Sequence, residues 1–165
     1  MKRVQLYDTT LRDGAQQAGV SFSVEDKLKI ARKLDELGIQ YIEGGWPGSN
    51  PKDEEFFKRA RKLRLSRAVL AAFGSTRRPK AKASADANLM ALVEAGVQVV
   101  TIVGKSWDGQ VTRVLETTQE ENLAMIAESI MFLRSKGIMC SLMRSTTSMA
   151  TRRIRVMRWK PPWRL

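Results

Sequence analysis

The sequence predicts an α/β fold, in which a parallel β-sheet is built from strands that alternate with helices along the chain. Four strand-like apolar segments are each followed by a segment with apolar residues at helical spacing. This alternation requires crossover connections, and these make the strands parallel. A doubly wound sheet and the first half of a (β/α)8 barrel both fit. The 165 residues fall short of the roughly 250 of a closed barrel.

The first strand–helix unit is bounded by clear start and stop signals. Residues 4–8 form a short expected strand. Ser23 is an N-cap candidate with the acid Asp26 three residues later, and Gly38 is a natural helix stop. Two more units are expected next: a strand at 39–43 with a helix opening at Asn50-Pro51, and a strand at 68–73 with a helix at 86–95. A strand at 97–103 and a helix at 118–136 complete the fourth unit.

The charge and composition limit the classes of function. The net charge is +12, but residues 141–165 carry seven of the 29 Lys and Arg and none of the acids. The rest of the chain therefore suits an enzyme of anionic substrates, and a basic nucleic-acid-binding module is the alternative from another class. No apolar run approaches the roughly 20 residues that cross a bilayer. The single cysteine gives no disulfide framework, which fits the cytoplasm, and the absence of histidine excludes a His-based triad within these residues.

The segment with the most chemistry is Y-D-T-T-L-R-D-G-A-Q at residues 7–16, where the first strand ends. Catalytic side chains of a barrel gather at this end of its strands. The oxygens of Asp13 suit a divalent metal ion, and Arg12 can stabilise a developing enolate or alkoxide. An isolated R-D-G triplet also fits an ordinary surface turn, so the triplet alone does not assign a site.

The longer string D-T-T-L-R-D-G-A-Q resembles the signature of a metal-dependent aldolase-like family. That family contains isopropylmalate, homocitrate and citramalate synthases and hydroxymethylglutaryl-CoA lyase. Residues 22–31 continue the resemblance, and residues 41–53 and 104–108 are similar to the citramalate synthase branch. The resemblance runs from residue 1 to about residue 139. It implies the first half of a (β/α)8 TIM barrel, as a partial catalytic domain at residues 1–140.

The resemblance also implies an activity and its machinery. The reaction is that of an acyltransferase of amino-acid biosynthesis, which condenses acetyl-CoA with a 2-oxo acid such as pyruvate and then hydrolyses the thioester. Isopropylmalate and homocitrate synthases remain alternatives. Arg12 is implied to polarise the 2-oxo acid carbonyl, Asp13 to bind a divalent Mg, Mn or Zn ion, and Gln16 to contact the substrate. A homodimeric parent protein without a membrane partner is implied as well.

Two further residues are candidates from their positions on strands. Glu43 ends the second expected strand and can orient Arg12 through a charge-assisted hydrogen bond, although a carboxylate that only caps a loop fits almost equally well. Thr101 lies in the fourth strand, toward the end of the sheet that carries Arg12, and is a candidate for substrate binding.

The last residues depart from the family pattern. The metal-binding H-x-H motif of the family is absent, because the chain has no histidine. Residues 141–165 fit a disordered basic tail or a patch for an anionic partner, but an out-of-frame translation explains more. Shifting the reading by one base from Leu142 permits a segment that contains D-A-E-H, which resembles the fifth-strand motif of the family. We therefore expect activity from the parent protein and not from this chain alone.

Overall fold

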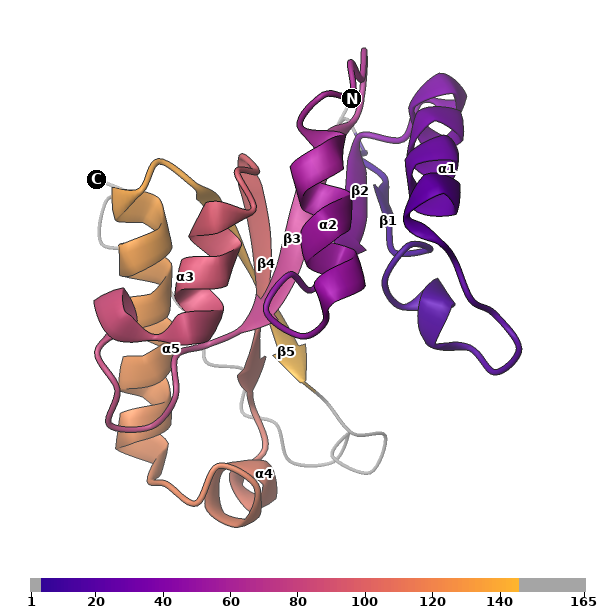
Figure 1. Cartoon of the computed structure of the whole chain (residues 1–165). Coiled ribbons are helices and arrows are strands. Elements are labelled where there is room, and N and C mark those ends of the chain that lie inside the picture. Colours follow the sequence, from indigo (N-terminus) through magenta and orange to yellow (C-terminus); the bar gives the residue numbers. More distant parts are fainter. Residues whose placement is uncertain (1–3, 146–165) are drawn as a thin grey trace.

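Five parallel β-strands form one sheet whose spatial order follows the chain, β1-β2-β3-β4-β5 (Figure 1). The computed structural model describes residues 4–145. A doubly wound sheet reverses its strand order at a switch point, whereas a barrel adds each strand beside the previous one. The sequential order therefore selects the half barrel, and the expected α/β class is confirmed. The strands are β1 Tyr7–Asp8, β2 Tyr41–Gly45, β3 Val69–Ser75, β4 Val99–Lys105 and β5 Met139–Ser145.

Each expected helix is present, together with short helical segments that the sequence did not predict. The new ones are α4 and two 3-10 turns, which are too short to display a 3.6-residue period. The helices are α1 Val24–Leu37, α2 Pro51–Ala60, α3 Ala87–Glu94, α4 Asp108–Arg113 and α5 Gln119–Ser135, with the 3-10 turns η1 Gly14–Gln16 and η2 Ala83–Ala85.

Local hydrogen bonds at the helix ends explain the element boundaries. The Ser23 hydroxyl accepts from the Asp26 backbone N–H and the Asp26 carboxylate accepts from the Ser23 N–H, so the expected capping box is present. Gly38 ends α1 in the left-handed region, with φ of 89°. The Ile39 N–H then bonds the Leu34 carbonyl at 3.1 Å. Ile39 therefore belongs to the helix cap, and β2 begins two residues later than expected.

Strand β5 completes the described sheet. It pairs with β4 from Val99 opposite Met139 to Lys105 opposite Ser145, so the edges of the sheet are β1 and β5. The strand continues five residues past the domain boundary expected at residue 140. The remainder of the expected out-of-frame segment, residues 146–165, lies outside the described residues.

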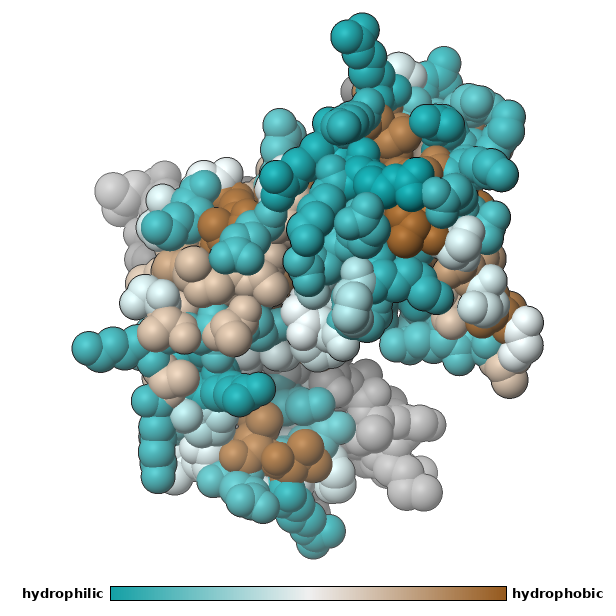
Figure 2. Space-filling model, in the orientation of Figure 1, coloured by the Kyte–Doolittle hydropathy of each residue, from teal (hydrophilic) through white to brown (hydrophobic). Residues whose placement is uncertain are grey.

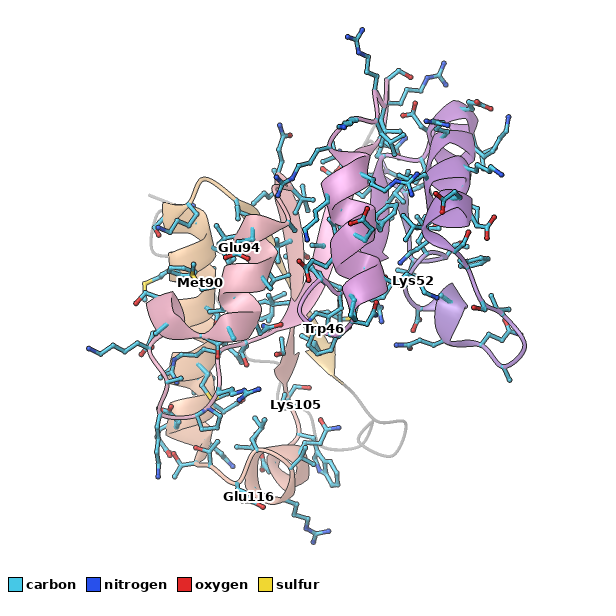
Figure 3. The ribbon with its side chains drawn as sticks, in the orientation of Figure 1. Trp46, Lys52, Met90, Glu94, Lys105 and Glu116 are labelled. Atoms are coloured by element: carbon cyan, nitrogen blue, oxygen red, sulfur yellow. The ribbon has the colours of Figure 1, made fainter. Side chains whose placement is uncertain are left out.

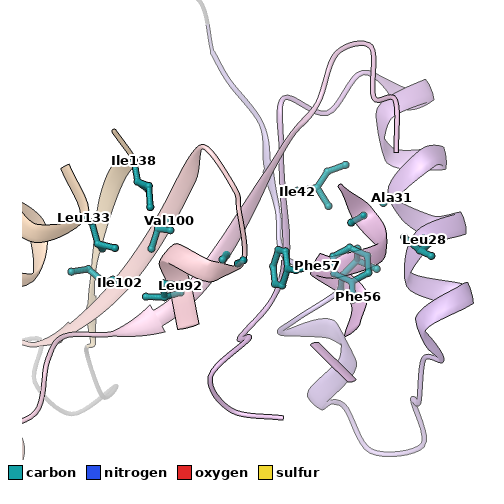
Figure 4. Close-up of a cluster of buried hydrophobic side chains, with 14 of the residues drawn as sticks. Leu28, Ala31, Ile42, Phe56, Phe57, Leu92, Val100, Ile102, Leu133 and Ile138 are labelled. Atoms are coloured by element: carbon teal, nitrogen blue, oxygen red, sulfur yellow. The ribbon is translucent and has the colours of Figure 1, made fainter. Parts of the chain in front are cut away.

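The helices and one face of the sheet enclose the hydrophobic core, which includes Phe56 and Phe57 of α2 and Leu92 of α3 (Figure 4). The surface over α1 and α2 is mainly hydrophilic in Figure 2. Among residues 4–145, no helix combines the length and apolar character needed to span a membrane.

Asp35 of α1 stabilises the connection between α2 and β3 through hydrogen bonds. Its carboxylate accepts from the backbone N–H groups of Ser66, Arg67 and Ala68 at 2.7–2.9 Å, and from the Ser66 hydroxyl at 3.0 Å. Burial alone raises the pKa of Asp35, but these donors outweigh burial and lower the pKa to about 2. The ionised carboxylate is thus the form that stabilises this connection.

We expect Asp35→Asn to lower the free energy of unfolding by about 2 kcal/mol at pH 7, because one oxygen with two acceptor positions is replaced by a donor. The folded-state pKa lies below the unfolded value of about 3.9, so the carboxylate stabilises above that value and loses its effect as the pH falls toward 2. Urea unfolding between pH 3 and 7 measures this difference. Glu36→Gln, on the exposed face of α1, is the control. A gap between wild type and Asp35→Asn that stays constant with pH would contradict the assignment.

Candidate active site

The candidate site lies on the sheet face opposite the helices, which we call the inner face. Successive residues of a strand point to opposite faces. Ile42 and Val100 join the core beneath the helices, so their neighbours Glu43 and Thr101 point to the inner face. Phe73 of β3 is paired in register with Thr101 and shares that face. Three adjacent strands thus bring these side chains together.

Arg12 is held over the inner face by the loop that follows β1. Its neighbour Leu11 is fully buried and anchors the loop in the core. The carbonyl of Thr9 accepts from the N–H groups of Arg12, Asp13 and Gly14 at 2.8–3.2 Å, which folds the chain into a tight turn. These backbone hydrogen bonds therefore hold the turn at Arg12 independently of the contacts of its side chain.

The guanidinium of Arg12 lies between a carboxylate and an aromatic ring. Its Nε donates to Glu43 Oε1, and its central carbon lies 4.0 Å from the centroid of the Phe73 ring. The Glu43 side chain is fully buried, and that of Arg12 is 13% exposed. A buried carboxylate needs a charged partner, and a guanidinium over a ring face gains a cation–π attraction. The structure thus brings together the predicted pair Arg12 and Glu43.

Tyr7 is part of the same cluster and was not predicted. Its hydroxyl donates to Glu43 Oε2 at 2.6 Å and lies 2.8 Å from Thr101 Oγ1. Burial and then the hydrogen bond to Glu43 raise the pKa of Tyr7 above its ordinary value. The Thr101 hydroxyl therefore already has a protein partner, and its contact with a substrate stays a prediction. Phe73 was also missed, because it lies within an apolar run that carries no polar signal.

Asp13 lies beside Arg12, and Asp13 and Gln16 both line an open cavity. Asp13 Oδ1 is 3.5 Å from Nη1 of Arg12, and the Asp13 side chain is 62% exposed. The cavity has a volume of about 600 Å³ and sits at the mouth of β1. Arg12 does not line the cavity itself but adjoins it through Asp13. The cavity is lined by Tyr7, Asp8, Thr9, Thr10, Asp13, Gly14, Gln16 and Gln17.

The described residues supply only part of a metal site. Asp13 has the oxygen donors that a hard divalent ion prefers. A catalytic metal is normally held by about three protein ligands, and within residues 4–145 no group of three His, Cys, Asp or Glu side chains could hold one. Asp13 therefore fits as one ligand of a larger set.

Trp46, which follows β2, connects the site to a buried ion pair. Its ring meets Phe73 edge-on at 5.5 Å, and its indole N–H donates to Asn88 at 2.7 Å. Trp46 and Lys105, at the end of β4, mark this end of the sheet in Figure 3. Behind Trp46, Asp53 accepts from the Trp46 backbone N–H at 2.9 Å and from the Lys27 ammonium.

Lys27, Asp53 and the Trp46 backbone are called the Asp53 clasp. Both charged residues are buried, with 3% and 7% of their surfaces exposed. Gly45 has φ of 148°, and a Cβ there would collide with the Asp53 carboxylate. The clasp therefore joins α1, α2 and the loop after β2, and it fixes the start of the Trp46 segment.

A family model described as HMGL-like matches residues 3–156 of the chain. An (R)-citramalate synthase of Aquifex aeolicus is 58% identical over 133 residues, which are 81% of this chain and 25% of that protein. A probable 2-isopropylmalate synthase of Archaeoglobus fulgidus is 31% identical over 140 residues, 85% of this chain and 26% of that protein. The chain thus spans about a quarter of the length of the curated relatives it matches.

The fold is also similar to that of solved structures. The HMG-CoA lyase of Bacillus subtilis matches with a TM-score of 0.65 and 18% sequence identity. The match covers 88% of this chain and 47% of the lyase chain. At this identity the comparison supports the fold alone, and the covered share agrees with a half barrel.

Proposed function

The chain belongs to the HMGL-like family, and on that premise we propose that it is the N-terminal part of an acyltransferase that condenses acetyl-CoA with a 2-oxo acid. We propose pyruvate as the 2-oxo acid, because identity is 58% to the citramalate synthase and 31% to the 2-isopropylmalate synthase. The observation that carries the proposal is Arg12, held between the Glu43 carboxylate and the Phe73 ring beside the cavity that Asp13 and Gln16 line.

The proposed role of Arg12 is to stabilise negative charge on the 2-oxo acid. In the condensation, the methyl group of acetyl-CoA loses a proton, and the resulting enolate attacks the keto carbon. The carbonyl oxygen becomes an alkoxide, and hydrolysis of the thioester then releases CoA. A guanidinium that is already oriented can donate to this oxygen without reorganisation in the transition state. Glu43 is proposed to orient Arg12 and Gln16 to hydrogen-bond the substrate, while Thr101 reaches this cluster through its contact with Tyr7.

We propose a divalent ion, Mg, Mn or Zn, for the full-length enzyme, with Asp13 as one ligand. When bound, such an ion supplies Lewis-acid polarisation of the substrate carbonyl. The remaining ligands are expected from parts of the protein beyond the described residues, because Asp13 alone is insufficient. As the family resemblance implies, the full-length enzyme is proposed to be a cytoplasmic homodimer.

Residues 141–165 are proposed to be read out of frame. The support is their composition, with seven basic residues and no acid, and the D-A-E-H segment that a one-base shift permits. Sequencing the DNA around the Cys140 codon tests this proposal. An uninterrupted reading frame without codons for the shifted segment would reject it.

A chimeric enzyme tests the proposed function. Residues 1–140 of this chain replace the matching part of the Aquifex aeolicus (R)-citramalate synthase, and CoA release is followed with pyruvate and with 2-oxoisovalerate. We expect kcat/KM to favour pyruvate by at least tenfold, since an extra methylene or two changes binding in a fitted pocket by about 1–3 kcal/mol. The relative itself, without replacement, is the control. A preference for 2-oxoisovalerate would support the 2-isopropylmalate synthase alternative, and a folded but inactive chimera would count against the proposal.

A further inference from the structure

A chain of hydrogen bonds runs across the inner face from β4 to the loop after β1. Thr101 Oγ1 lies 2.8 Å from the Tyr7 hydroxyl, which lies 2.6 Å from Glu43 Oε2. The other oxygen of Glu43 accepts from Arg12 Nε. Thr101 is 3% exposed, and the side chains of Glu43 and Arg12 are 0% and 13% exposed, whereas Tyr7 is 37% exposed. The two ends of the hydrogen-bond chain and the Glu43 carboxylate are therefore shielded from water.

The direction of each bond follows from the inventory of protons. Glu43 is paired with a guanidinium that stays charged, so its carboxylate only accepts. Tyr7 has one hydroxyl proton and must donate it to Glu43. The contact between Tyr7 and Thr101 therefore has Thr101 as the donor and the Tyr7 oxygen as the acceptor. The hydroxyl proton of Thr101 is thus used in a hydrogen bond within the protein.

We propose that Tyr7 and Thr101 are positioning residues, which hold the second oxygen of Glu43 so that its first oxygen fixes the guanidinium of Arg12. Without the Tyr7 hydroxyl, Glu43 Oε2 would be a buried acceptor with no partner among these residues. The carboxylate would then rotate to find another hydrogen-bond donor for Oε2, and its hydrogen bond from Arg12 Nε–H would weaken. The importance of this role for a reaction rests on the proposed function, but the positioning itself does not.

The geometry of Arg12 makes it sensitive to such a rotation. The Phe73 ring, with its centroid 4.0 Å from the guanidinium carbon, restrains one side of the group, while Glu43 restrains its Nε. Nη1 is then directed to the side of Asp13, at 3.5 Å from Oδ1. A side chain that donates hydrogen bonds to a developing alkoxide needs both restraints, because a donor stabilises the charge only from the correct position.

The test uses the 15N-labelled chain and the Nε–H resonance of Arg12, assigned by its loss in Arg12→Lys. We expect Tyr7→Phe and Thr101→Val to change its chemical shift and to speed its exchange with water by about tenfold, the size expected for losing one hydrogen bond to a charged group. Thr101→Ser keeps the donor and should restore the wild-type behaviour. Tyr41→Phe is the matched control, since the Tyr41 ring packs beside that of Tyr7 with centroids 6.1 Å apart.

A second measurement separates this inference from the proposed function. Pyruvate is titrated into each protein while the same resonance is followed, and we expect binding about tenfold weaker in Tyr7→Phe and Thr101→Val. If wild type fails to bind pyruvate but Arg12 exchange still responds, the positioning role stands, and the chimeric enzyme remains the test of the proposed function. If Tyr7→Phe does not fold, the comparison of Thr101→Val with Thr101→Ser decides whether the positioning role holds. Unchanged Arg12 exchange in every folded variant would overturn the inference.

Discussion

Arg12→Ala is expected to slow condensation by the chimeric enzyme about 10³-fold in kcat, because loss of one oriented donor to a developing oxyanion typically costs 10²- to 10³-fold. The charge of the guanidinium is lost at the same time. The variant also removes the charged partner of Glu43, whose side chain is fully buried. CoA release at saturating pyruvate measures this change.

Two variants separate the role of Arg12 from a general effect of charge. Arg12→Lys keeps a cation but loses the planar fork that pairs with a carboxylate, so we expect an intermediate loss of about 10- to 100-fold, between the values for one weakened and one removed donor. Arg32→Ala removes an exposed arginine of α1 and should leave kcat unchanged. A rise in KM alone for Arg12→Ala would show uniform substrate binding instead of transition-state stabilisation. Unchanged kinetics would remove the central support for the proposed function.

Asp53→Ala is expected to lower the free energy of unfolding by about 3–5 kcal/mol, the typical effect of breaking a buried ion pair. The substitution leaves the buried Lys27 ammonium without its counter-ion and the Trp46 N–H without its acceptor. Such a loss is a large fraction of the roughly 5–15 kcal/mol that stabilises a typical domain. Urea unfolding followed by circular dichroism measures it.

The neighbour of Asp53 provides a matched control. Glu54 lies on the same helix and forms an exposed pair with Lys58, so Glu54→Ala should cost less than about 1 kcal/mol. Lys27→Met together with Asp53→Leu removes both charges and should recover part of the stability lost in Asp53→Ala. The same double variant still lacks the acceptor for Trp46. Equal effects of Asp53→Ala and Glu54→Ala would contradict the role of the clasp.

Local patterns were sufficient to predict much of the fold. Ser23, Asp26 and Gly38 mark the ends of α1 through hydrogen bonds that span a few residues, and these are visible in the sequence. The strand boundaries were less accurate, because Ile39 contributes to the helix cap before β2 begins. Helix α4 was missed, since six residues make fewer than two turns of about 3.6 residues.

The candidate site likewise contains residues that the sequence predicted and residues that it did not. Arg12 and Asp13 were candidates from their place at a strand end, and the family resemblance implied their roles and that of Gln16. Tyr7 and Phe73 were not predicted, because an aromatic residue in a strand is more often part of the core than of a site. Their roles depend on register: Phe73 is paired with Thr101, and the Tyr7 hydroxyl reaches residues on two other strands.

The sequence by itself determined the alternation of strands and helices, the helix caps and the Arg12-Asp13 segment, because these depend on residues within one or two turns of each other. Only the tertiary structure decided that the strands follow one another in order, and that Glu43 lies between Arg12 and Tyr7. The strand order comes from pairing between neighbouring strands, and the position of Glu43 from hydrogen bonds between residues 31 and 36 positions apart. Pairing over such separations is set by the free energy of the whole fold, which no local pattern contains.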